Sequence, residues 1–144
     1  MNVWWCNQSR TWRDESSKGT VCSSDKTSRP EFRRTVGEAR KGDLVIHYRS
    51  GHGVFAVSQA TANAVEYRKG DQRRICRYSN VGGGWAFPTR YHFLNPPIPK
   101  KAIIDKLLSL DMPNSPVLRL ASGKKQVRQA YFMKISLGAI SVVR

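Results

Sequence analysis

The stretch most able to do chemistry lies at the start of the chain, where residues 3–12 read VWWCNQSRTW. It contains three of the four tryptophans, Trp4, Trp5 and Trp12, together with the polar side chains of Asn7, Gln8 and Ser9. Indole faces stack on flat rings, and amide side chains carry both donors and acceptors that suit the edge of a nucleobase. The stretch therefore has two interpretations, a packed core strand or a pocket that reads a base.

The alternation of a β-strand limits these two interpretations. Successive side chains of a strand point to opposite faces, so Trp4 and Trp5 cannot both line one pocket. We expect one of them to face a base and the other to pack in the core. Asn7 and Gln8 are candidates for the base edge, and Ser9 is a candidate for a polar contact or for the cap of a helical turn.

A strong positive charge accompanies these residues. The chain has 25 Lys and Arg against 10 Asp and Glu, a net charge of +15, and no acidic residue follows Asp111. Such an excess attracts polyanions, and without a basic amphipathic stretch it favours nucleic acid over a membrane surface. The alternative is a solvated surface. Candidate contacts to a nucleic-acid backbone are Arg10, Arg13, Arg33, Arg34, His52, Arg73, Arg74, Lys124, Lys125 and Arg128.

The three cysteines indicate neither a zinc site nor a disulfide framework. Cys6, Cys22 and Cys76 are widely spaced and form no CxxC motif or Cys/His cluster. An odd number of cysteines without a secretory signal suggests a reducing cytoplasm. No apolar run is long enough for a membrane span, so no membrane partner is expected. We predict no metal and no cofactor.

Hydrophobic periodicity and turn-forming residues predict the strands and helices that position these side chains. Residues 41–60, KGDLVIHYRSGHGVFAVSQA, predict a β-hairpin. Pro99 opens a helix with Ile103, Ile104 and Leu107 on one face. Strands are predicted at residues 2–6, 44–48, 54–58, 64–67, 85–94 and 137–143, helices at 99–110 and 123–134, and a loop at 16–29. The pattern predicts one α+β domain over residues 1–144, with a curved or barrel-like sheet of five or six strands and two or three helices.

The ordered motifs WWCNQS, KGDLVIHYRSGHGVFAVSQA, GWAFPTRYHFLNPPIP and RQAYFMKIS resemble the EVE domain of the PUA-like superfamily, which is related to the YTH domain. The resemblance implies a pseudo-β-barrel that binds a modified nucleobase. EVE domains often serve as the reader modules of modification-dependent restriction systems, where they are fused to HNH nucleases or to GTP-driven motors. YTH domains read methylated adenine with an aromatic cage.

The resemblance also implies pocket residues. Trp85, after three glycines, corresponds to a segment that supplies a cage aromatic, and Tyr48 at a strand end could add an aromatic edge. The family often has a tryptophan in a segment that reads GTVCSS here, so Val21 or Cys22 stands at the expected cage position, and Ser23 is a polar candidate beside it. The predicted pocket consists of Trp4, Trp5, Asn7, Gln8, Ser9, Cys22, Ser23, Tyr48 and Trp85.

We therefore expect a binding module that flips a modified base, such as 5-methylcytosine, 5-hydroxymethylcytosine or N6-methyladenine, out of double-stranded DNA. No HNH block, PD-(D/E)xK pattern or phosphate loop is present, so no catalytic residue is predicted, and a nuclease is expected only as a fused or separate partner. Two alternatives remain. One is a PUA-like RNA-binding module, and the other is a small ASCH-like ribonuclease using Glu66, Tyr67 and Lys69.

Overall fold

The computed structural model describes residues 1–9, 11–24, 35–68, 83–110, 112, 115–128 and 131–143. Its elements, in chain order, are β1 (Val3–Asn7), α1 (Trp12–Lys18), β2 (Thr20–Ser24), η1 (Thr35–Glu38), β3 (Leu44–Arg49), β4 (Gly53–Ala60), β5 (Val65–Tyr67), β6 (Gly84–Ile98), α3 (Lys100–Ser109), β7 (Val117–Arg119), β8 (Lys125–Val127), β9 (Phe132–Ile135) and η3 (Leu137–Val143). Those labelled η are 3₁₀ helices.

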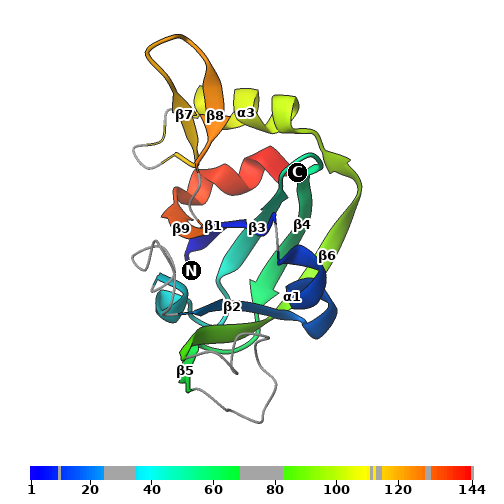
Figure 1. Ribbon diagram of the computed structural model, residues 1–144, viewed down its shortest axis with the longest axis vertical. Coiled ribbons are helices and arrows are strands. Elements are labelled where there is room, and N and C mark those ends of the chain that lie inside the picture. Colours follow the sequence, from blue (N-terminus) through cyan, green and yellow to red (C-terminus); the bar gives the residue numbers. More distant parts are fainter. Residues whose placement is uncertain are drawn as a thin grey trace.

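The main sheet has the strand order β2-β6-β4-β3-β1-β9, with β5 paired to β6. β1 runs parallel to β3 and antiparallel to β9, and the other pairs are antiparallel. β7 and β8 form a separate two-stranded ribbon, which lies at the opposite end of the molecule from β5 (Figure 1). β1 is thus an interior strand, and its four apolar residues are buried, as expected when both neighbours and both faces are covered.

The length of β6 accounts for the curl of the sheet. Its first residues, Gly84 to Pro88, pair with β2, and its later residues, Thr89 to Ile98, pair with β4. One continuous strand therefore joins two parts of the sheet and bends it into a half barrel (Figure 1). The predicted α+β class with a curled sheet is confirmed. The described residues contain one more strand in this sheet than we expected.

Several predicted elements are confirmed and three are wrong. The hairpin and the helix after Pro99 are present as β3, β4 and α3. Residues 16–29 were expected to be loop, but Thr20–Ser24 is strand β2 because it pairs with β6. The described residues of the range 123–134 are not helical, because Lys125–Val127 is strand β8 and Phe132–Ile135 pairs with β1 as β9. Residues 137–143 are a 3₁₀ helix rather than a strand, and their buried residues, Ala139 and Val142, are spaced three apart.

Asp43 fixes the start of the sheet from a buried position. Its carboxylate accepts hydrogen bonds from the backbone N–H of Asn2 and Arg40 and from Trp4 Nε1, at 2.9, 3.0 and 2.9 Å. Burial alone would raise the pKa of Asp43, but these donors outweigh it and hold the pKa below its ordinary value. The carboxylate therefore stabilises the fold above about pH 4, and this contribution is lost as the pH falls through the folded-state pKa.

Asp43→Ala is expected to lower the free energy of unfolding by about 2–3 kcal/mol, because it leaves buried donors, including Trp4 Nε1, without an acceptor. Urea unfolding followed by circular dichroism measures the change. The matched control is Asp105→Ala, which removes an exposed carboxylate paired with Lys125 at 3.1 Å and should cost less than about 1 kcal/mol. Equal losses in the two variants would contradict the role assigned to Asp43.

Candidate nucleic-acid interface

The predicted pocket aromatics of β1 and β3 lie in the core. Trp4 stacks on Phe132 at 4.7 Å between ring centroids, and Trp5 stacks on Tyr48 at 5.4 Å. Trp4 and Trp5 belong to different core clusters, so they point to opposite faces as expected. Because both indoles and Tyr48 are buried, none of the three offers a ring face to a ligand. This corrects the expectation that one indole lines an open pocket: the core cluster of Trp4 includes Val36 of η1 and Phe87 of β6, and that of Trp5 includes buried residues of α3 and η3.

Trp85, Cys22 and Ser23 lie together where β2 pairs with β6. Cys22 and Ser23 are fully buried, and the Cys22 sulfur takes part in a disulfide, which the odd number of cysteines did not predict. Trp85 is half-buried with its indole edge against Gly37, where an added Cβ would lie 2.7 Å from Trp85 Cδ1. Of these three predicted pocket residues, only Trp85 reaches solvent.

The polar residues after β1 organise the β3–β4 hairpin. Ser9 Oγ donates to Asn7 Oδ1 at 2.7 Å and accepts from the Ser50 backbone N–H at 3.0 Å. Asn7 Nδ2 is 3.4 Å from the Arg128 carbonyl oxygen, so the structure brings two predicted contact residues together across 121 positions of sequence. Asn7 and Ser9 thus hold the hairpin turn beside the end of β1.

Gln8 is the centre of a buried polar network rather than an exposed base-reading group. His47 Nδ1 and Gln8 Oε1 are 2.6 Å apart, and Gln8 Nε2 donates to the Glu15 carboxylate and, at 2.9 Å, to the Tyr91 hydroxyl. Tyr131 OH lies 2.6 Å from Glu15 Oε1 on the other side. These hydrogen bonds tie α1 to the sheet and fix the position of the Tyr91 ring.

The network sets the tautomer of His47. The Gln8 amide nitrogen faces the Glu15 carboxylate, so the Gln8 amide oxygen faces His47 and accepts a hydrogen bond from Nδ1–H. His47 Nε2 is then the acceptor for Ser58 Oγ at 2.7 Å, and Ser58 accepts from Thr89 at 2.6 Å. Complete burial lowers the pKa of His47 to about 3, so the ring is neutral at physiological pH. His47 is a satisfied core residue.

Four aromatic rings form a surface over this network, which we call the aromatic ledge: Trp12, Phe55, Tyr91 and Phe93. Phe93 stacks on Tyr91 and Phe55 with centroid distances of 5.9 and 6.4 Å, and Trp12 meets Phe55 edge-on at 6.0 Å. Phe55 is only 6% exposed, whereas Phe93 is 56% exposed. Trp12 and Tyr91 are partly exposed. The ledge therefore has a buried floor and an open outer face.

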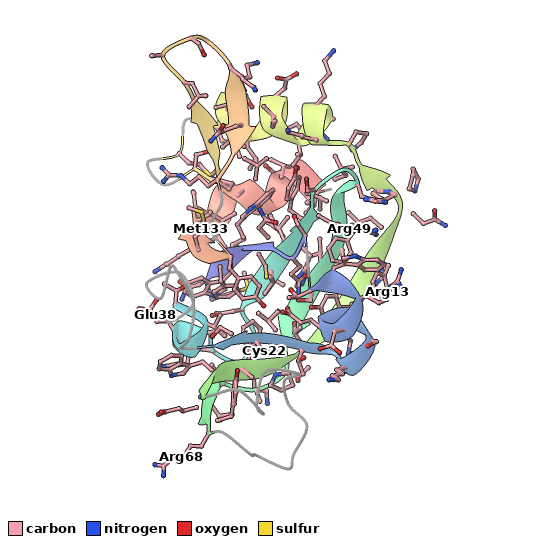
Figure 2. The ribbon with its side chains drawn as sticks, in the orientation of Figure 1. Arg13, Cys22, Glu38, Arg49, Arg68 and Met133 are labelled. Carbon is pink, nitrogen blue, oxygen red and sulfur yellow. The ribbon has the colours of Figure 1, made fainter. Side chains whose placement is uncertain are left out.

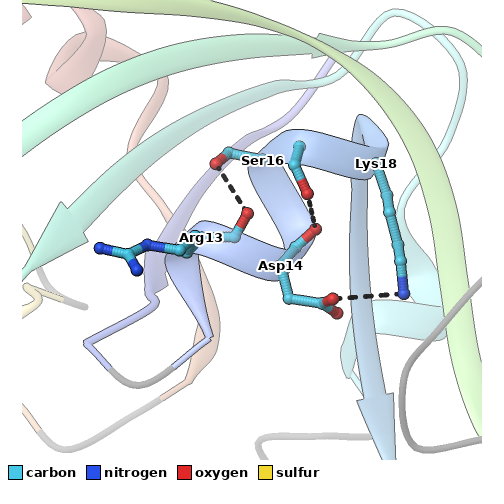
Figure 3. A network of polar contacts seen from close by, with 5 residues as sticks. Arg13, Asp14, Ser16 and Lys18 are labelled. Carbon is cyan, nitrogen blue, oxygen red and sulfur yellow. Dashed lines mark hydrogen bonds and ion pairs between the residues drawn. The ribbon is translucent and has the colours of Figure 1, made fainter.

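Two arginines flank the ledge. The Arg49 guanidinium carbon lies over the Trp12 ring at 3.7 Å from its centroid, and that of Arg13 lies at 5.3 Å. Figure 2 shows both on one side of the molecule, beside α1 and β6. Asp14 is paired with Lys18 at 3.2 Å, and Arg13 points away from that pair (Figure 3). Within the described residues, neither arginine forms an ion pair, so both positive charges are available to an anion.

The other residues that we predicted to contact a nucleic-acid backbone lie in several different parts of the chain. Arg10, Arg33, Arg34, Arg73 and Arg74 lie outside the described residues. His52 is exposed at the hairpin turn. Arg128 Nε donates to the Ser115 carbonyl at 2.8 Å, a structural role. Lys124 is exposed, and Lys125 lines a groove of about 350 Å³ with Lys100, Lys101, Ile104 and Asp105.

Sequence reasoning missed the ledge, although a signal was present. Phe87, Thr89, Tyr91 and Phe93 alternate along β6 and share one face, which passes from the core at Phe87 to solvent at Phe93. That alternation predicted the strand. It did not predict that α1 and the hairpin would place Trp12, Arg49 and Phe55 on the same face.

The described part of the chain shows no cluster of three or more His, Cys, Asp or Glu residues suited to a metal ion. Nor does any helix within those residues combine the length and apolar character needed to cross a membrane.

Comparison with known proteins supports the fold alone. No protein-family model and no curated protein matches the chain. Among solved structures, it is similar to a hypothetical protein from Leishmania major, with a TM-score of 0.59, 11% identity and coverage of 99% of this chain and 92% of that one. A protein from Agrobacterium tumefaciens gives a TM-score of 0.58 at 13% identity, with coverage of 99% and 90%. A protein from Pseudomonas putida gives 0.58 at 10%, with coverage of 98% and 96%.

Proposed function

We propose that this chain is a nucleic-acid-binding module that holds bases on the aromatic ledge. The observation that carries the proposal is the guanidinium of Arg49 on the Trp12 ring, beside the open face of Phe93. Aromatic rings and guanidinium planes stack on bases, while arginine side chains also neutralise phosphates. The net charge of +15 supports a polyanionic partner.

The ribonuclease alternative has less support. Tyr67 is buried and its hydroxyl donates to the Ser23 carbonyl, whereas the neighbouring Glu66 is exposed. Alternation of β5 therefore separates these two side chains, and Lys69 lies outside the described residues. We accordingly propose a binding module rather than an enzyme.

A second candidate is the reading of a modified base flipped from double-stranded DNA, as the EVE resemblance implies, with a partner or fused nuclease. The partial exposure of Trp85 favours it, because this predicted cage aromatic reaches solvent where β2 pairs with β6. An RNA-binding PUA-like module would use the same ledge.

Fluorescence anisotropy with matched oligonucleotides tests these candidates. The panel contains duplex DNA with unmodified cytosine, 5-methylcytosine, 5-hydroxymethylcytosine, glucosylated cytosine or N6-methyladenine, and the matched RNA. Preference for one modified duplex, lost in Trp85→Ala but retained in Phe93→Ala, would support a pocket near Trp85. Loss in Phe93→Ala but not in Trp85→Ala would support the ledge. Absence of binding to every oligonucleotide would overturn the proposed function.

Affinity is expected to fall steeply with salt, because phosphate contacts release condensed counterions. If about four phosphates are neutralised, the slope of log K against log salt is roughly −3 for single strands and steeper for duplex DNA. Titrations over a range of sodium chloride concentrations measure it. A flat response would argue against a nucleic-acid partner.

A further inference from the structure

We infer that the aromatic ledge takes unpaired nucleic acid, with neighbouring bases of a single strand on Phe93 and on the Arg49 guanidinium that covers Trp12, in preference to an intact duplex. This inference rests on the proposed function and names the ligand class of the same site. It rests on the exposed faces of the ledge, on the hydrogen bonds that hold the Tyr91 ring beneath them and on the positive charges beside them.

The ledge offers exposed ring surface to a ligand. Phe93 is more than half exposed although its neighbours Tyr91 and Phe55 are stacked against it. A base inside a duplex has both faces covered by adjacent base pairs, so it cannot stack on such a ring. Only an unpaired or extruded base can cover Phe93.

The ledge has two neighbouring stacking positions. Trp12 and Phe93 both contact Phe55, so they are neighbours on one surface and belong to α1 and β6. A single extruded nucleotide presents one base, whereas consecutive nucleotides of a single strand present one base to each position. The Arg49 guanidinium covers the Trp12 ring, so the base at this position stacks on that cationic plane.

Hydrogen bonds hold the Tyr91 ring at the floor of the ledge. The Tyr91 hydroxyl donates to the Thr20 carbonyl at 2.8 Å and accepts from Gln8 at 2.9 Å, and its ring lies 4.4 Å from that of His47. The rings are held before a ligand arrives, so little conformational entropy is lost when a base binds.

The charges select an anionic occupant. Arg13 and Arg49 border the ledge, the carboxylate of Asp14 is paired with Lys18, and Glu15 is buried beneath the surface. A ligand with flat apolar faces and regularly spaced negative charges fits this arrangement, and a single nucleic-acid strand has both properties.

The test compares four ligands of equal length by fluorescence anisotropy at one salt concentration: a thymidine oligonucleotide, an adenosine oligonucleotide, an abasic strand and a duplex. We expect both base-bearing strands to bind about 10-fold or more tightly than the abasic strand and the duplex. Phe93→Ala should weaken single-strand binding by about 5- to 150-fold, the range of one lost base stack. Phe93→Tyr should retain most of the affinity.

Two further readouts keep the test decisive. Leu137→Ala, at a residue 54% exposed on η3, controls for loss of exposed apolar surface and should leave affinity unchanged. Single strands should also quench tryptophan fluorescence, and Trp12→Phe should reduce that quenching more than Trp85→Phe. Because Phe93 is exposed, its variants are expected to fold, and circular dichroism checks this.

The outcomes separate the inference from the proposed function. Equal binding of the abasic strand, the duplex and the base-bearing strands, unaffected by Phe93→Ala, would overturn the inference while leaving a nucleic-acid-binding protein. Tighter binding of the duplex would also overturn it. If no nucleic acid binds at any salt concentration, the proposed function itself fails.

Discussion

Lowering the pH from about 7 to about 4 is expected to reduce the free energy of unfolding by about 3 kcal/mol through His47 alone. Burial lowers the pKa of His47 to about 3 in the folded protein, from an ordinary value near 6.5. Below pH 6.5 the unfolded chain therefore binds a proton at His47 that the folded chain does not bind. The contribution of the neutral His47 ring to the free energy of unfolding is present above pH 6.5 and is lost progressively as the pH falls toward 3.

His47→Gln isolates this contribution, since glutamine carries a donor and an acceptor but no titrating group. Urea unfolding at several pH values should give a shallower pH dependence for this variant than for the parent, although its stability at neutral pH is lower. His92→Gln, which removes an exposed imidazole from β6, is the matched control for the loss of a histidine. Parallel curves for His47→Gln and the parent would contradict the buried neutral histidine.

Gly53→Ala is expected to cost about 4 kcal/mol or to prevent folding. Gly53 begins β4 with φ = 91°, in the left-handed region that other residues rarely adopt. A Cβ at this position would lie 1.9 Å from the carbonyl oxygen of Ile98, so the end of β6 would have to move away from β4. The variant should also displace α3, which begins just after β6.

Gly51→Ala in the same turn separates the cost of the positive φ from the cost of the clash with Ile98. Gly51 has φ = 80°, but nothing lies within 4 Å of an added Cβ, so only the backbone strain of about 1–2 kcal/mol applies. Urea unfolding of the two variants should therefore differ by about 2 kcal/mol or more. Equal stability would show that β6 does not pack against Gly53 as described.

The β3–β4 hairpin and α3 could be predicted because their signals are local. Glycines with positive φ lie in the turns next to the hairpin strands, and Ile103, Ile104 and Leu107 recur at helical spacing on α3. Such patterns act over a few residues, where backbone sterics and a single buried face decide the outcome. The charge excess, which indicates the partner class, is likewise a property of composition.

The segments around residues 123–143 could not be assigned from local pattern. Phe132–Ile135 is a strand because β1 offers an open edge to it, and β1 lies about as far away in the sequence as the chain permits. A short apolar run fits a helix or a strand equally well until its partner is known. η3 likewise depends on the core cluster that buries Ala139 and Val142.

The sequence by itself determined the ring types, the charge and the alternation of Trp4 and Trp5 on opposite faces of β1. Only the tertiary structure decided that both indoles are sealed, because the rings that stack on them come from β3 and β9, far along the chain, and the rest of their core clusters from several other elements. It also decided that Trp12, Arg49, Phe55 and Phe93 meet at one surface. Strand alternation fixes which face a side chain takes, but whether that face meets protein or water depends on long-range packing, which no local pattern encodes.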